Sequence, residues 1–222
     1  MDSDLMPGAP VTSPEVSTAS SDRRLRVRRF LWRAAGALAL LVFASLMWAR
    51  HSFPSDRTPE GAYLRIVIAV NRGQPKDIFA YTETRAQHAC YTIRDYRKKT
   101  RDRVLQSFPE PERTRLSLTY AEEADAPDGS DVLAIYAKRN GWMNRLRQDL
   151  SGIAKVEIQG ERATLQTARG TRYPFRRREN GIWGLTQFTA VLEAEAEKAA
   201  RDLSLIERSA TDYERAGKGA TP

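Results

Sequence analysis

The amino-acid sequence predicts an α+β protein with one N-terminal transmembrane helix, several helices packed on an antiparallel sheet, and a long C-terminal helix. Three observations support this fold class. Residues 30–49 form an almost uninterrupted apolar run. Over residues 58–150, apolar residues recur at spacings of three and four, as in helices. Over residues 154–187, apolar and polar residues alternate in short runs that glycines separate, as in strands. The chain has 222 residues, which leaves room for one domain after the N-terminal segment.

Residues 1–22, "MDSDLMPGAPVTSPEVSTASSD", are mostly small and polar. Such a segment cannot bury enough apolar surface to offset the entropy lost on ordering, so we expect a disordered tail. The next segment, residues 23–29, is a basic flank. Its arginines are predicted to hold the N-terminus in the cytoplasm, because positive charge flanking a membrane span stays on that side. They are Arg23, Arg24, Arg26, Arg28 and Arg29.

Residues 30–49 have the length and composition of a membrane anchor. About 20 apolar residues in a helix cross hydrocarbon roughly 30 Å thick. Phe30 begins the run, and Trp32 and Trp48 lie near its ends, where aromatic residues gather at membrane interfaces. Arg33 lies near the start, where its side chain can extend to the headgroups. The sequence therefore predicts a single-pass signal-anchor in the inner membrane, with the lipid bilayer as a partner.

The alternatives to an anchor are a cleaved leader, a core helix and a mitochondrial presequence. A cleaved leader needs small residues directly after its apolar run, whereas this run ends "SLMWARHSF". A core helix needs a polar stripe, and a mitochondrial presequence needs amphipathicity. The apolar run has neither. We therefore favour an uncleaved anchor with the rest of the chain in the periplasm.

Residues 50–57 are predicted to be a linker, residues 58–216 an extracytoplasmic α+β domain, and residues 217–222 a disordered tail. The domain begins with a helix that has Thr58 as N-cap, Pro59 at its first position and Gly73 at its end. A second short helix is predicted over "PKDIFAYTET" and a longer third over "RAQHACYTIRDYRKKTRDRVLQSF". The segment "PEPER" then breaks the chain.

The third predicted helix carries two features of interest. One is a basic face, which could contact phosphates or anionic lipid, although such charge runs are more often solvated. The other is Cys90, the only cysteine, two residues after His88. That spacing separates the two side chains around a helix, which favours a buried small side chain over a nucleophilic pair. The basic face comprises Arg94, Arg97, Lys98 and Arg101.

The segment 121–131, "AEEADAPDGSD", is predicted to be an acidic turn or loop, and it lacks the ligand order of a calcium loop. Two short helices, "DVLAIYAKRN" and "WMNRLRQDL", are predicted on either side of Asn140 and Gly141. Ser130 is the predicted N-cap of the first of them.

The region 154–187 is predicted to form a meander of about four antiparallel strands. Its apolar residues alternate in three short runs, and glycines separate the runs. Asn180 and Gly181 form a sequence typical of a type I′ hairpin turn, and Pro174 favours an edge strand or a bulge. The alternating pairs are Val156 and Ile158, Ala163 and Leu165, and Tyr173 and Phe175.

The last segment, "FTAVLEAEAEKAARDLSLIERSATDYERAG", has apolar residues at alternating four- and three-residue spacings, which predicts one long helix. We expect it to pack against its own domain, since tertiary contacts usually hold amphipathic helices. A coiled-coil contact with a partner helix is the alternative.

Charge and metal-ligand composition narrow the function classes. The chain carries 36 basic and 28 acidic residues, a net charge of +8, and the two signs are interspersed. A nucleic-acid-binding protein more often concentrates its basic residues on one face, so no nucleic-acid partner is expected. One cysteine and two histidines cannot form a structural Cys/His zinc tetrad, and no cofactor or metal site is predicted.

Three motifs, "TPEGAY", "NRGQPKDIFAYTETR" and "GIWGL", in this order resemble the nuclear-transport-factor-2-like superfamily, which includes ketosteroid-isomerase-like enzymes, over about residues 58–190. The resemblance implies helices folded against a curved sheet, in a cone with a cavity. Catalysis there would require a carboxylate and hydrogen-bond donors pointing into that cavity. The candidates to line it are Tyr63, Asp77, Tyr91 and Trp183, although aromatic residues at such positions are more often part of the core.

We therefore expect a single-pass membrane protein that presents a non-catalytic ligand- or protein-binding domain outside the cytoplasm. Its partner would be another envelope protein or a small apolar ligand. The alternatives are a small-molecule enzyme of the ketosteroid-isomerase-like type and a domain that binds anionic lipid or nucleic acid. No catalytic residue is assigned from the sequence.

Overall fold

The structure is a computed structural model that describes Leu38, residues 40–45 and residues 54–219. The chain divides into two compact units, Met1–Phe53 and Pro54–Pro222. The second unit contains all the helices and strands discussed below.

The transmembrane helix predicted over residues 30–49 is not supported by the structure. None of the helices that the described residues form is long and apolar enough to cross a membrane. The helical residues described in this segment are Leu38 and residues 40–45. The prediction relied on the apolar composition of the segment alone.

For the described residues the fold class is therefore corrected to α+β with no helix able to cross a membrane. The predictions of a signal-anchor and of a single-pass protein of the inner membrane are corrected with it. The residues on which they depended lie outside the described part of the chain; they are the basic flank of residues 23–29 and the anchor residues Phe30, Trp32, Arg33 and Trp48.

The second unit begins with α2 (Pro59–Arg72), whose predicted ends are confirmed. The hydroxyl oxygen of Thr58 accepts a hydrogen bond from the Gly61 amide at 3.1 Å, and Pro59 occupies the first turn. Gly73 ends the helix with a φ of +69°, a left-handed conformation that favours glycine.

The second predicted helix is shorter than expected. It consists of α3 (Pro75–Ile78) followed by a 3₁₀ turn, η1 (Phe79–Tyr81). Thr82 is extended and forms an isolated parallel bridge with Leu185 of the sheet. The long α4 (Thr84–Ser107) then follows, as predicted for the third helix.

Three further helices follow α4, and the first of them was not predicted. This helix, α5 (Glu112–Ala124), starts directly after Pro111, and the Glu110 carboxylate accepts a hydrogen bond from the Thr114 amide at 3.2 Å. The next are α6 (Gly129–Arg139) and α7 (Trp142–Asp149). The N-cap of α6 is Asp128, which accepts from the Gly129 amide, and not Ser130.

The predicted meander of four antiparallel strands is confirmed. Its strands are β1 (Ile153–Gln159), β2 (Arg162–Thr167), β3 (Arg172–Arg177) and β4 (Trp183–Leu185), in this spatial order. Alternate residues such as Leu165 and Phe175 are buried on the face that meets the helices, and their neighbours Thr164 and Arg176 face solvent.

Two details of the sheet differ from the expected turn and edge. The Gly181 amide donates to the Arg178 carbonyl at 2.9 Å, and Gly181 has a φ of +82°, so the loop is longer than a two-residue type I′ turn. Pro174 lies in β3, between β2 and β4. Pro174 is tolerated because β4 ends at Leu185, and the carbonyl of Pro174 accepts from the amide and the hydroxyl of Thr186, just beyond that strand.

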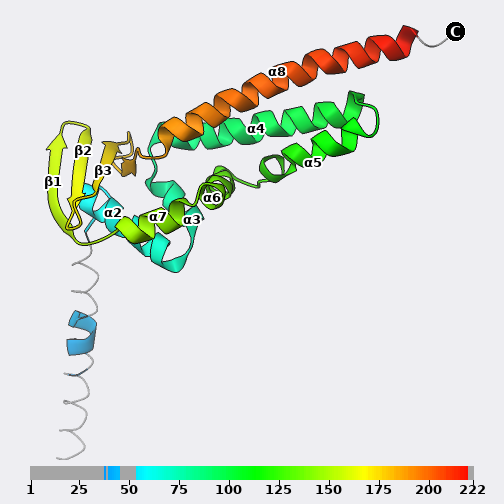
Figure 1. The fold of residues 1–222 in the computed structure, drawn as a ribbon. Coiled ribbons are helices and arrows are strands. Elements are labelled where there is room, and N and C mark those ends of the chain that lie inside the picture. The colour runs from blue at the N-terminus through cyan, green and yellow to red at the C-terminus, as the bar shows by residue number, and fades with distance from the viewer. Residues whose placement is uncertain (1–37, 39, 46–53, 220–222) are drawn as a thin grey trace, which may run out of the picture. The chain divides into compact units, whose positions relative to one another are not determined.

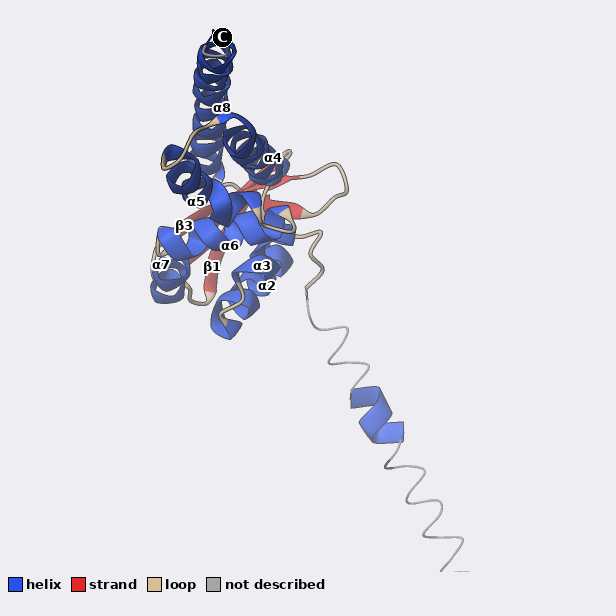
Figure 2. Ribbon diagram, turned by 90° about the vertical axis from the view of Figure 1, so that its right-hand side faces the viewer, coloured by secondary structure: helices blue, strands red, loops and turns tan. Residues whose placement is uncertain are grey.

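The last helix, α8 (Thr189–Gly219), packs beside α4, as predicted for its own domain. The two helices run in the same direction, because Arg85 pairs with Glu193 near their starts and Arg103 with Glu214 near their ends. Figures 1 and 2 show that α4, α5 and α8 extend together away from the sheet. We call these three helices the arm and the remainder of the unit the body.

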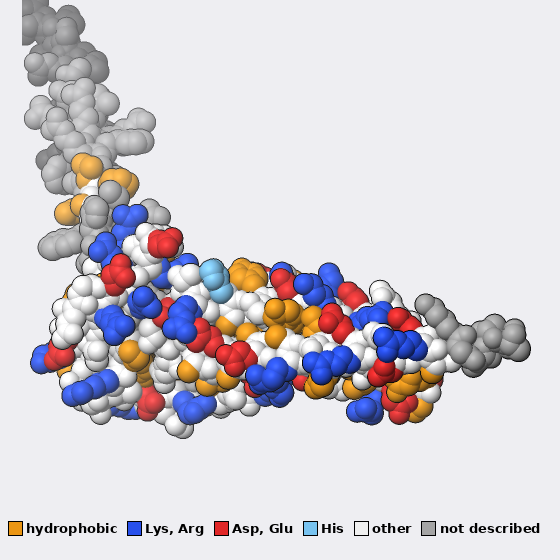
Figure 3. Space-filling view, turned by 90° about the horizontal axis from the view of Figure 1, so that it is seen from above, with side chains coloured by type: hydrophobic (Ala, Val, Ile, Leu, Met, Phe, Trp, Pro, Cys, Tyr) orange, Lys and Arg blue, Asp and Glu red, His pale blue; other side chains and the backbone are white. Residues whose placement is uncertain are grey.

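The unit has two apolar cores. The larger one lies between the sheet and α2, α6 and α7, extends to the first turns of α4 and α8, and includes Ile66, Leu133 and Leu165. The smaller one holds the arm together and consists of Val104, Phe108, Ile206 and Ala210 with flanking Leu116 and Tyr120. On the face seen in Figure 3, charged side chains of both signs are interspersed over body and arm.

Candidate functional site

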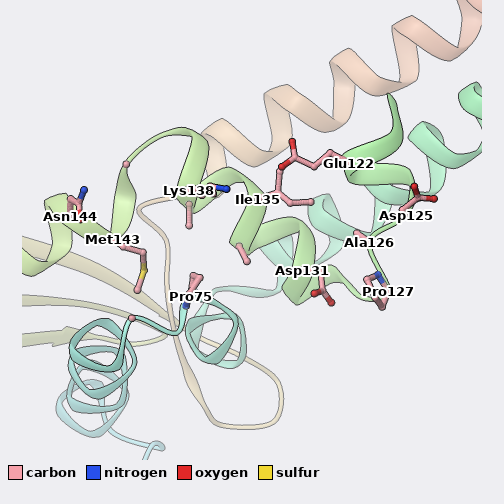
Figure 4. A pocket seen from close by; sticks show the side chains of 14 residues that line it. Pro75, Glu122, Asp125, Ala126, Pro127, Asp131, Ile135, Lys138, Met143 and Asn144 are labelled. Carbon is pink, nitrogen blue, oxygen red and sulfur yellow. The ribbon is translucent and has the colours of Figure 1, made fainter. Parts of the chain in front are cut away.

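An open groove with a volume of about 680 Å³ lies over α6 (Figure 4). The helix α6 lies along it. The turn between α2 and α3 borders it, as do the segment after α5 and the beginning of α7. The lining residues are Gly73, Pro75, Glu122, Asp125, Ala126, Pro127, Asp131, Ala134, Ile135, Ala137, Lys138, Gly141, Met143 and Asn144.

Apolar side chains from three helices meet in this groove. Ala134 and Ile135 come from α6, Pro75 from the start of α3, and Met143 from the first turn of α7. The opposite face of α6 is part of the core, where Val132 and other apolar residues are buried. Since residues three and four apart share a helix face, α6 presents one apolar face to the core and a second, narrower one to the groove.

Carboxylates surround this apolar centre, and each is tied to a cation. Glu122 pairs with Arg139 at 2.7 Å. The carboxylate of Asp125 pairs with Arg101 of α4, and that of Asp131 pairs with Lys76 of α3. Ion pairs between separate elements hold the rim of the groove in place, although exposed pairs of this kind add little stability. Among the described residues no ion-pair partner is found for the remaining rim cation, Lys138.

A buried polar network lies behind the groove and fixes α6 against α5 and α8. Arg139 contacts Glu123 at 2.8 Å, and Glu123 is only 5% exposed. The Arg139 guanidinium also lies 5.1 Å from the ring centre of Tyr136, whose hydroxyl donates to Glu195 at 3.2 Å. Burial, followed by the charges of Glu123 and Glu195, raises the pKa of Tyr136. These contacts make α6 a rigid support for the groove.

The start of α6 is fixed by a second set of contacts. The Tyr91 hydroxyl is hydrogen-bonded to Asp128, which raises the pKa of the tyrosine and lowers the pKa of the carboxyl group. The ring of Phe79 packs edge-on against Tyr91, with their centres 5.8 Å apart. A β-carbon on Gly129 would lie 2.9 Å from the Phe79 ring, so this position requires a residue without a side chain.

Of the four residues predicted to line a cavity, Tyr63 and Trp183 belong to the larger apolar core, and the other two lie on α3 and α4. Tyr63 is buried and its hydroxyl donates to the Ser151 carbonyl at 2.8 Å. Trp183 is buried and donates from its ring nitrogen to the Arg57 carbonyl at 3.0 Å. Asp77 is exposed on α3, and Tyr91 lies on α4 beside Asp128. None of them lines the groove over α6.

The basic face predicted on the third helix is largely occupied by contacts within the domain. Arg97 is buried and contacts Asp202 of α8 at 2.5 Å. Arg94 bonds Asp95 and the Pro127 carbonyl, and Arg101 pairs with Asp125. On the same helix, Cys90 is buried while His88 is exposed.

The groove offers binding chemistry of a simple kind. The described residues that line it contain no histidine, cysteine, serine, threonine or tyrosine. No group of three or more His, Cys, Asp or Glu residues in the described part of the chain could hold a metal ion. What the groove provides is an apolar centre inside a charged rim, the arrangement found where protein surfaces meet.

Sequence reasoning missed the groove because its shape depends on how α5, α6, α7 and the turn at Gly73 and Pro75 pack together, which local patterns do not specify. The signal that could have indicated it is within "DVLAIYAKRN", where apolar residues occupy more than one face of a short helix. Ile135 is half-buried, because it packs against the core and also lines the groove.

Comparison of the chain with protein-family models, with curated proteins and with solved structures finds no match.

Proposed function

We propose that the domain is a non-catalytic binding module whose groove over α6 takes an apolar segment of another protein. The observation that carries this proposal is the second apolar face of α6, with Ile135 at its centre and Met143 and Pro75 beside it. Exposed apolar surface rimmed by polar residues is typical of protein interaction sites.

The shape of the groove favours a protein segment over a small apolar ligand. Sites for small molecules usually bury about 70–90% of the ligand surface, which requires an enclosed cavity. This groove is open and bordered by side chains from four separate elements. An amphipathic helix can place residues at i, i+3 and i+4 along such a floor and keep its polar face in water. Methionine suits this role because its flexible side chain adapts to the shape of a partner.

The charged rim would determine which segment fits. Three carboxylates and Lys138 border the apolar centre, and three of these four groups already have partners within the domain. Rim charges of this kind affect association rate and specificity more than affinity. The free ammonium group of Lys138 favours a segment with a carboxylate beside its apolar residues.

A selection experiment tests the proposal. A displayed library of amphipathic helical peptides is panned against the full chain, and the affinity of each selected peptide is measured by fluorescence anisotropy. Ile135→Glu and Met143→Glu are each expected to weaken binding at least ~10-fold, because they place a charge in the apolar centre of the interface. The matched control is Leu118→Glu on α5, a site 70% exposed and outside the groove, which is expected to leave binding unchanged.

Two results would contradict the proposal. One is selected peptides that bind wild type and Ile135→Glu equally well, which would place their site elsewhere. The other is a failure to select any peptide while the dye 1-anilinonaphthalene-8-sulfonate binds wild type and not Ile135→Glu. That outcome would assign the groove to small apolar ligands.

A further inference from the structure

The strand β1 forms one end of the sheet, as Figure 1 shows. It spans Ile153–Gln159 and pairs with β2 on one side only. Within the described residues nothing pairs with its other side, so a row of backbone amides and carbonyls is left free. Such an edge is a template for another strand unless it is blocked.

Strand β1 carries two of the features that restrict an edge, a bulge between Ile153 and Lys155 and the charge of Lys155 itself, but no charged side chain that points toward the core. The regular part of the strand therefore runs from Lys155 to Gln159. Here the core-facing positions are apolar, because Val156 pairs with Leu165 and Ile158 with Ala163, both of which are buried. Ile158 is 56% exposed, since no further strand covers it. An added strand would bury this side chain.

The turn between β1 and β2 determines which backbone groups point outward. Gln159 and Arg162 close a two-residue turn, so they form the first hydrogen-bonded pair, and such pairs then alternate along the ladder. The backbone groups of Gln159, Glu157 and Lys155 therefore point toward β2. Those of Ile158 and Val156 point outward, where a new strand would bond them.

We propose that the occupant of this edge is β1 of a second copy of the chain, paired antiparallel about a two-fold axis at Val156. In that register the outward amide of Val156 in each copy donates to the carbonyl of Val156 in the other copy. Lys155 stands directly opposite Glu157 of the second copy, and Glu157 opposite Lys155. Opposite charges in directly facing positions stabilise a strand pair.

Charge complementarity is what singles out a second copy. Lys155 and Glu157 lie on the solvent face of β1, two residues apart on either side of Val156, and contact each other at 2.6 Å in the single chain. A strand with this order of charges is complementary to itself only when it is reversed, which is the geometry of a two-fold dimer.

The inference is independent of the proposed function. The groove over α6 is built from α3, α5, α6 and α7, and β1 contributes none of its lining residues. Each copy in the dimer would keep its own groove. A failure of either proposal therefore leaves the other standing.

A charge exchange tests the dimer by sedimentation velocity of the full chain. A single strand pair buries little area, so association is expected to be weak and is measured at about 100 µM protein. Lys155→Glu and Glu157→Lys each place like charges opposite one another at both symmetric positions. Each variant alone is expected to raise the dimer dissociation constant about tenfold or more.

The two variants mixed in equal amounts restore opposite charges and are expected to form a heterodimer. The double variant Lys155→Glu with Glu157→Lys should dimerise like wild type for the same reason. Matched controls are Lys198→Glu and Glu207→Lys on α8, which make the same changes in net charge away from the sheet and should not affect association. Far-ultraviolet circular dichroism confirms that each variant is folded.

Three outcomes would overturn the proposal. A wild-type chain that is monomeric at this concentration has no such dimer. Single variants that associate as well as wild type would show that any dimer uses another surface. A mixture of the two variants that remains as dissociated as each alone would show that these charges do not face one another.

Discussion

Gly184 lies where strand β4 passes directly against the start of α4. A β-carbon at this position would come within 2.6 Å of the Glu83 backbone nitrogen and Cα and of the Thr82 carbonyl oxygen. These atoms belong to the backbone, so a side-chain rotation cannot relieve the contact. The sheet and the first turn of α4 therefore approach as closely as they do because residue 184 has no side chain.

We expect Gly184→Ala to lower the free energy of unfolding by about 1–3 kcal/mol, the usual cost of an overpacked contact. Urea denaturation followed by circular dichroism measures the change. Gly152→Ala is the matched control, because a β-carbon there meets nothing within 4 Å, and its expected effect is within about 0.5 kcal/mol. Equal unfolding midpoints for the two variants would mean that β4 and α4 can separate without cost.

Cys90 is the only cysteine of the chain and is fully buried in α4. Burial raises the pKa of its thiol from 9.0 to about 12. The thiolate is the form that reacts, so both the low thiolate fraction and the lack of access protect this residue. We expect Ellman's reagent at pH 8 to react with the folded chain at least ~100-fold more slowly than with the guanidinium-unfolded chain. A comparable rate in both states would contradict the burial of Cys90.

The same shift in pKa has a consequence for stability at alkaline pH. The folded state keeps the thiol proton at a pH where the unfolded state has lost it. The contribution of the protonated Cys90 thiol to the free energy of unfolding is therefore complete below about pH 9 and disappears as pH rises toward 12. Between pH 8 and 11 the wild type is expected to lose more unfolding free energy than Cys90→Ala. Parallel pH profiles for the two proteins would contradict this.

At the scale of the elements, the contact between α4 and α8 depends on one buried cation. Arg97 is 6% exposed, contacts Asp202 at 2.5 Å, and lies 5.1 Å from the ring centre of Tyr120 on α5. It therefore touches all three helices of the arm. Removing its carboxylate partner would leave a guanidinium group inside the arm without its counter-ion.

We expect Asp202→Asn to lower the unfolding free energy by about 1–3 kcal/mol, the cost of leaving a buried charge unpaired. Glu197→Gln on the same helix is the matched control, since its pair with Arg201 is 3.7 Å long and both side chains are well exposed. That change should cost no more than about 0.5 kcal/mol. Equal losses in urea denaturation would show that Arg97 is solvated in solution.

The helix ends and the strands were predictable where a local signal determined them. Thr58, Pro59 and Gly73 gave the limits of α2, because capping depends only on nearby residues. The alternation in β2 and β3 likewise predicted which residues are buried. The helix α5 was missed because its sequence "ERTRLSLTYAEEA" is mostly polar and its few apolar residues pack only against the arm. Tertiary contacts, more than local propensity, hold such a helix.

At the scale of the whole molecule, the sequence predicted that helices pack on an antiparallel sheet, but it did not predict the groove over α6. Tyr63 and Trp183 were candidates because the cavity implied by the family resemblance would need hydrogen-bond donors, yet their hydrogen bonds end on the backbone carbonyls of Ser151 and Arg57. The groove is lined instead by Pro75, Ile135 and Met143, which come from α3 and from the consecutive helices α6 and α7. Such a site depends on how the helices cross, which the residues of any single segment do not specify.

The parallel pairing of α4 with α8 affects the order in which the chain can fold. Arg85 and Glu193 are joined across 108 residues, while α5 follows α4 after a short turn. The α4 and α5 hairpin can therefore form early during synthesis, but the side of α4 that contacts α8 stays uncovered until the body has been made. In that interval Val104 and Phe108 are exposed, and chaperones that bind apolar helices would meet the nascent chain there.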